Sequence, residues 1–135
     1  VAQLRLALAT SLGRLDEAIV AAQALGLEAV VAALSLRRGL ERGEPLAELE
    51  RWATEPLGRV ALGERALGAG DAARALRAAD GVLVTEPWMP EALVLRARAL
   101  EALGRGPDAA ETWGRARAAD PALDGLGVDT ATSAR

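Results

Sequence analysis

The sequence predicts an all-α chain of seven or eight helices, and three observations carry that prediction. Ala and Leu, both strong helix formers, together fill 55 of the 135 positions. Runs of β-branched residues are almost absent, and the longest candidate, residues 82–84, runs directly into Thr85-Glu86-Pro87. Gly and Pro recur between apolar-periodic stretches, where they mark helix ends.

Gly and Pro also mark where the first helices begin and end. We expect helices over residues 1–12, 15–25, 27–41, 45–54, 57–69, 71–84, 90–103 and 107–119. Gly13 separates the first helix from the second, and Gly43 closes the third. Pro45 stands at the start of the fourth, where a missing N–H is harmless.

The later helices carry clearer end signals. Gly70 closes the fifth helix, and Asp71 behind it is a favoured N-cap residue for the sixth. Pro90 opens the seventh helix, and Pro107 suits the first turn of the eighth. Residues 121–135 lack apolar periodicity, so we expect a flexible tail there.

The later part of the chain contains an internal repeat with an offset of 34 residues. It separates Gly70 from Gly104 and Pro87 from Pro121. It also aligns small or apolar residues, namely Gly63 with Ala97, Ala75 with Ala109, and Val82 with Ala116. This pattern resembles the tetratricopeptide repeat, a helix-turn-helix unit in which small residues let neighbouring helices approach closely.

The resemblance implies antiparallel helix pairs stacked in a right-handed α-solenoid, with residues 1–120 as one repeat domain. It covers residues 56–121 most closely, residues 1–27 less regularly and residues 28–55 only in part. Arg96 departs from it, because that position is usually apolar. Each helix pair has two apolar faces, so neighbouring pairs must stack to bury them.

The same resemblance implies a groove along the first helix of each pair. Its expected partner-binding residues are Val60, Glu64 and Leu67 in one repeat, Val94, Arg98 and Glu101 in the next, and Arg37 and Glu41 in the degenerate repeat. An apolar floor with charges of both signs suits a peptide or helix. We therefore expect a protein–protein interaction scaffold. The chaperone-binding branch of the family grips a carboxylate with Lys and Asn, and this chain has neither.

Two other functions remain open. The pattern of Ala66–Asp71, Glu86-Pro87-Trp88, Glu91-Ala92 and Ala102–Arg105 resembles the helical activator domain of bacterial transcription regulators. In those proteins the repeats lie beside a separate DNA-binding domain, so this chain would be a regulatory module that does not contact DNA. In the second alternative the chain is a helical accessory domain of a larger enzyme.

Composition excludes several kinds of site. The chain has no Cys, His or Lys, so it cannot form a disulfide, a thiolate nucleophile, a Schiff base or an ordinary zinc or haem site. Neighbouring carboxylates, such as Asp16 and Glu17, point apart on a helix and are typical of solvated faces. We therefore expect no catalytic residue, no metal and no cofactor.

Charge and hydropathy also limit the partners. The net charge is −3 and no segment is basic, which argues against nucleic acid and anionic membranes. No apolar run reaches the roughly 18 residues of a membrane span. A protein or peptide partner in the cytoplasm is the expectation that remains.

Tryptophans and the chain's first helix give further expectations. We expect Trp52 and Trp113 to lie in the core. We expect Trp88 to pack against adjoining helices and hold them together, and an interaction hot spot is the alternative. The first helix is apolar on more than one side, as Leu4, Leu6 and Leu8 illustrate. Either further helices upstream or self-association through this face is therefore expected.

Overall fold

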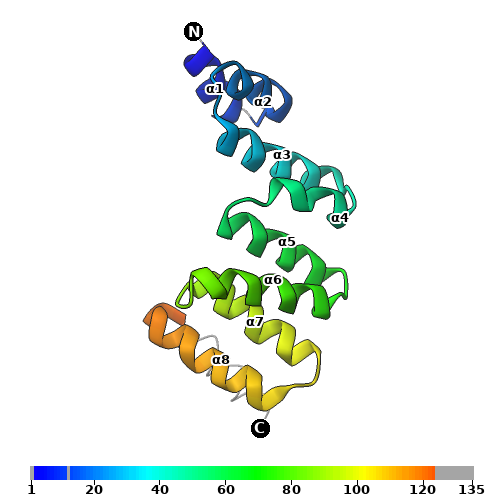
Figure 1. Cartoon of the computed structure of the whole chain (residues 1–135), viewed down its shortest axis with the longest axis vertical. Coiled ribbons are helices and arrows are strands. Elements are labelled where there is room, and N and C mark those ends of the chain that lie inside the picture. The colour runs from blue at the N-terminus through cyan, green and yellow to red at the C-terminus, as the bar shows by residue number, and fades with distance from the viewer. Residues whose placement is uncertain (1, 12, 124–135) are drawn as a thin grey trace. The chain divides into compact units, whose positions relative to one another are not determined.

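The computed structural model describes residues 2–11 and 13–123, which form helices joined by short turns (Figure 1). The α-helices are α1 (Ala2–Ser11), α2 (Leu15–Ala24), α3 (Glu28–Arg42), α4 (Leu46–Leu49), α5 (Pro56–Gly68), α6 (Ala72–Thr85), α7 (Pro90–Ala102) and α8 (Gly106–Ala119). Two 3₁₀ helices, η1 (Glu50–Trp52) and η2 (Pro121–Leu123), follow α4 and α8. Over these residues there is no strand, so the all-α prediction is confirmed.

The helix bounds agree with the sequence analysis to within one residue, except in the fourth helix. There, a helix predicted over residues 45–54 is a single α-helical turn continued by η1. Residues 121–123 of the expected tail form η2, and residues 124–135 lie outside the described residues. No described helix has both the length and the apolar character needed to span a membrane.

The chain divides into two compact units, and the division falls inside α5. Unit 1 comprises Val1–Arg59 and unit 2 comprises Val60–Arg135. The expectation that residues 1–120 form one repeat domain stays a prediction.

Five turns share one geometry that only glycine adopts without strain. They are centred on Gly13, Gly26, Gly43, Gly70 and Gly104, all with φ between 69° and 88°. After each glycine, the next N–H donates to the carbonyl of the residue four positions before the glycine. Asp71 N to Ala66 O, at 2.9 Å, is one example. This is the Schellman closure of a helix C-terminus. Of these glycines, Gly13, Gly43, Gly70 and Gly104 were predicted to mark helix ends, and Gly26 was not singled out.

Unit 1 is built on the packing of α1 against α2 and of α2 against α3. Its core contains Ala9, Leu15, Ala18, Ile19, Ala22 and Leu34, with Leu6, Val30 and Val31 packed around them. The short α4 and η1 contact α3, and Leu49 is 1% exposed. Leu49 lies against Gly39, because a Cβ at that position would collide with a Leu49 methyl group.

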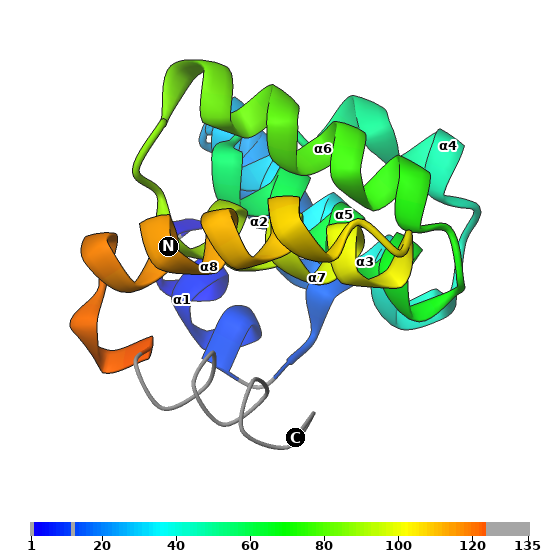
Figure 2. The ribbon, with the colours of Figure 1, turned by 90° about the horizontal axis from the view of Figure 1, so that it is seen from below.

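Unit 2 is built on the packing of α6 against α7 and of α7 against α8, and Figure 2 shows α6 and α8 along their length. One core cluster contains Leu93, Ala97, Trp113 and Ala116. Trp113 is 7% exposed, as predicted, whereas Trp52 in unit 1 is only half-buried.

The helices of unit 2 follow the predicted offset in detail. α5 and α7 begin 34 residues apart and end 34 residues apart, and so do α6 and α8. The aligned small or apolar residues Gly63, Ala97, Ala75, Ala109, Val82 and Ala116 are all buried. At Gly63 an added Cβ would lie 3.1 Å from the Ala78 Cβ and 2.5 Å from Leu95 Cδ2, so α5 approaches α6 and α7 closely.

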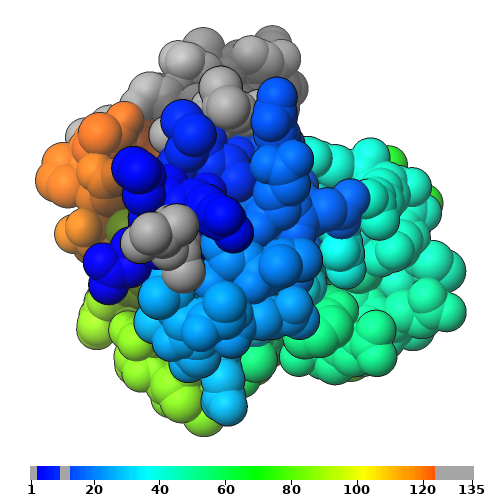
Figure 3. All heavy atoms as spheres, turned by 90° about the horizontal axis from the view of Figure 1, so that it is seen from above, coloured from blue at the N-terminus to red at the C-terminus, as the bar shows by residue number. Residues whose placement is uncertain are grey.

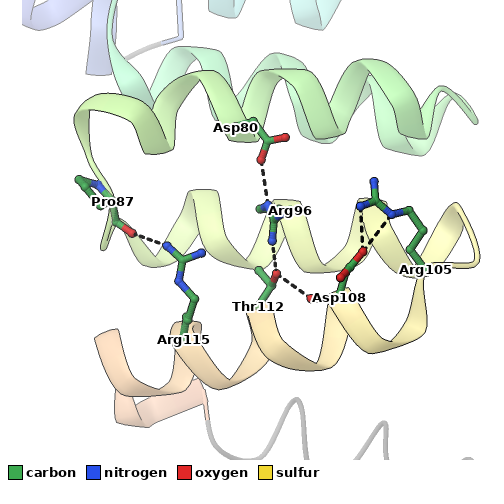
Figure 4. A network of polar contacts seen from close by, with 7 residues as sticks. All are labelled: Asp80, Pro87, Arg96, Arg105, Asp108, Thr112 and Arg115. Atoms are coloured by element: carbon green, nitrogen blue, oxygen red, sulfur yellow. Dashed lines mark hydrogen bonds and ion pairs between the residues drawn. The ribbon is translucent and has the colours of Figure 1, made fainter.

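Arg96, which departs from the repeat pattern, is held by polar partners on two neighbouring helices (Figure 4). Its Nε donates to Asp80 Oδ1 on α6 at 2.8 Å, and its Nη1 donates to Thr112 Oγ1 on α8. Thr112 is fully buried and donates in turn to the Asp108 carbonyl at 2.9 Å. A polar residue is tolerated at this position because its guanidinium hydrogen-bonds to both neighbouring helices.

Candidate functional site

Helix α7 is buried around most of its circumference. The residues that are at most 1% exposed are Ala92, Leu93, Leu95, Ala97, Ala99 and Leu100. Apart from its end residues and Arg96, the residues of α7 that are not buried form a single line along the helix, namely Glu91, Val94, Arg98 and Glu101. These four are spaced three or four residues apart, so they share one face of the helix. Three of them are predicted partner-binding residues.

The charged residues on this line differ in how they are engaged. Arg98 is exposed, and no carboxylate of the described residues forms an ion pair with it. Glu101 accepts a hydrogen bond from Trp113 Nε1 at 3.1 Å, so it also fixes the indole of a core residue. Val94 is half-buried against the cluster around Trp113. Arg98 is therefore the cation on this face whose hydrogen-bond donors remain available.

Helix α5 carries the other predicted residues of unit 2, and it places them differently. Glu64 is exposed and Leu67 is half-buried, as a binding face requires. Val60, however, is only 2% exposed, so it has no surface to offer a partner. The expectation for Val60 is corrected: it lies on the wide buried side of α5 with Gly63 and Ala66, and it contributes to the core.

The two predicted residues on α3 belong to unit 1. Arg37 Nε donates to Glu41 Oε1 at 3.2 Å, and both side chains are about half exposed. An exposed pair one helical turn apart contributes little to stability, so either partner can be released at small cost. The predictions for these two residues stay predictions.

A charged cluster in unit 1 was not expected from the sequence. Asp16 Oδ1 accepts from Arg38 Nη1 at 2.9 Å, and Oδ2 accepts from Arg42 Nη2 at 2.8 Å. The hydrogen bond from Arg38 lowers the pKa of the Asp16 carboxyl, and the charge of Arg42 lowers it further against the opposing effect of partial desolvation. Arg38 and Arg42 share a face of α3, which was the available signal; the partner on α2 could not be assigned without the packing.

Trp88 is not inserted between helices. It is 60% exposed at the turn between α6 and α7, with Arg115 Cζ 5.7 Å from its ring centre. Arg115 Nη2 also donates to the Pro87 carbonyl at 3.4 Å, as Figure 4 shows. The arginine thus ties α8 to the turn, while the outer surface of the indole stays open.

The described residues contain no group of three or more carboxylates placed to hold a metal. Comparisons of the chain with protein-family models, with curated proteins and with solved structures found no match.

Proposed function

We propose that this chain is a helical-repeat interaction module of the tetratricopeptide type, and that unit 2 binds a peptide or helix of a partner protein along α5 and α7. The observation that carries the proposal is the single exposed line of α7. On it, Arg98 has no described carboxylate partner and lies one turn from half-buried Val94.

The repeat character of unit 2 supports the proposal. Two helix pairs share their lengths, their glycine turns and their buried small residues at an offset of 34 positions. A helix pair of this kind cannot bury both of its apolar faces alone, which favours stacking of neighbouring pairs. Right-handed stacking into a solenoid is part of what we propose.

The chemistry of the face indicates the ligand class. The guanidinium of Arg98 matches a carboxylate with two parallel hydrogen bonds. Val94 and Leu67 offer apolar surface without being fully exposed, and Glu64 adds a negative charge on α5. The expected ligand is a peptide that combines an acidic residue with apolar side chains.

Selection from a random peptide display library on the full chain tests this proposal. The enriched peptides should carry an Asp or Glu together with apolar residues. Arg98→Glu should weaken their binding by about tenfold or more, the scale of an interface hot spot. Glu101 is left unchanged, because reversing its charge would also break its bond to Trp113.

The matched control is Arg77→Glu, which reverses an exposed arginine on α6. This variant should bind the selected peptides as the original chain does, and circular dichroism should show equal helicity for both variants. Peptides that bind Arg98→Glu as tightly as the original chain would place the binding face elsewhere.

A further inference from the structure

The first two helices of unit 1 leave an apolar groove uncovered. A cavity of about 510 Å³ lies along α1 and α2, and its floor is formed by Leu8, Ala9, Val20, Ala21 and Ala24. Leu8 is 58% exposed and Val20 is 65% exposed. Figure 3 shows α1 and α2, in blue, facing the viewer. Large aliphatic side chains gathered at a groove are typical of an interface.

Leu4 extends this apolar surface along α1. It is 71% exposed and precedes Leu8 by one helical turn, so the two side chains share a face. Together with Val20 they form what we call the N-terminal face, defined by Leu4, Leu8 and Val20 around the groove.

The charges on the rim of the groove are of both signs. Arg5 lines it from α1, and no carboxylate of the described residues forms an ion pair with Arg5. Glu17 and Arg14 also line it, and among the described residues the ion pair of Glu17 is a long, exposed contact of 3.7 Å to Arg14. Asp16 is already held by Arg38 and Arg42. A helix carrying one sign of charge would meet repulsion from part of this rim.

We propose that the N-terminal face binds a second copy of this chain in a two-fold symmetric dimer. Since α1 and α2 form an antiparallel hairpin, Arg5 lies at one end of the groove on the α1 side and Glu17 at the other end on the α2 side. A two-fold axis that lies in the plane of the N-terminal face, perpendicular to the line from Arg5 to Glu17, exchanges these corners. Arg5 of each copy then meets Glu17 of the other, and the apolar floors cover one another.

Charge exchange on the full chain tests this arrangement by sedimentation equilibrium over a wide concentration range. The original chain should form a closed dimer. Arg5→Glu and Glu17→Arg should each weaken dimerisation by about tenfold, because each turns two exposed attractive pairs into repulsive ones. Mixing the two variants should restore a heterodimer, since the side chain at position 5 of each copy then again faces one of opposite charge at position 17 of the other.

Arg77→Glu is the matched control and should dimerise as the original chain does, and thermal unfolding should confirm that every variant folds. A monomeric original chain, open polymers, or a dimer indifferent to both charge reversals would each overturn the proposal. A mixture that stays monomeric while both variants are folded would do the same. None of these results affects the peptide-binding face on unit 2, which is tested separately.

Discussion

In unit 1, α3 turns at Gly43 into a second α-helix of only four residues, whereas in unit 2 α7 turns at Gly104 into α8, which has fourteen. The two turns close alike: Glu44 N donates to Gly39 O at 3.0 Å, and Arg105 N donates to Leu100 O at 2.8 Å. The turns themselves are therefore alike, and the large difference in helix length comes after the turn, in the second element.

This difference in length changes how each pair is held together. With a short second element, α4 and η1 contact α3 less extensively than α8 contacts α7, and the one large buried side chain of α4, Leu49, is fitted against Gly39. With a long second element, contact with α7 is shared among several buried residues of α8, including Ala109, Trp113 and Ala116. The short α4 and η1 together contribute one buried residue, Leu49, whereas α8 contributes four.

The largest effect is expected from Leu49→Ala. Removing a side chain that is 1% exposed leaves a cavity against Gly39, and the free energy of unfolding should fall by about 2–5 kcal/mol. Urea denaturation followed by circular dichroism measures this. Leu57→Ala removes the same atoms from a residue that is 62% exposed, and it should change the free energy by no more than about 0.5 kcal/mol.

A second substitution sharpens this result. Gly39→Ala should destabilise the original chain, because the new Cβ meets Leu49, yet it should stabilise the Leu49→Ala variant by up to about 1 kcal/mol, since Ala is the better helix former. Equal effects of Gly39→Ala in both backgrounds would show that Leu49 and Gly39 are not coupled.

A smaller effect is expected from Ala109→Leu in unit 2. Ala109 is 2% exposed where α8 meets its neighbours, so a larger side chain would overpack the contact at a cost of about 1–3 kcal/mol. Ala110→Leu makes the same change at the next, exposed position and should be almost neutral. Equal melting temperatures for the two variants would contradict the helix register assigned to α8.

The smallest effect is expected from the charged cluster of unit 1. The folded-state pKa of Asp16 is lowered chiefly by the hydrogen bond from Arg38, so its ionised form favours the folded chain. This contribution is complete above the ordinary Asp pKa of about 3.9 and is lost as the pH falls through the lowered pKa. The melting temperature of Asp16→Asn should therefore lie below that of the original chain at neutral pH, and the gap should close in acid. A gap unchanged at a pH of about 2 would contradict this role.

Local chemistry made most of the helix bounds predictable. Helix-forming composition and glycines placed for positive φ act over a few residues, so Gly70 and Gly104 could be assigned to turns before any packing was known. Asp71 is such a case too, since its side chain accepts from Arg74 N at 3.0 Å, as expected of an N-cap. Arg98 and Glu64, which the resemblance to the tetratricopeptide repeat assigned to a groove, are both exposed.

Which side chains meet across helices was decided by the tertiary structure. Val60 and Val94 are equivalent in the sequence pattern, yet Val60 is buried and Val94 half-buried, because burial depends on the neighbours of each helix. The bonds of Arg96 to Asp80 and of Glu101 to Trp113 join separate helices. A repeating sequence specifies how each helix begins and ends, but a side chain reaches its partner only after the helices have packed, and packing depends on the summed shapes of many residues.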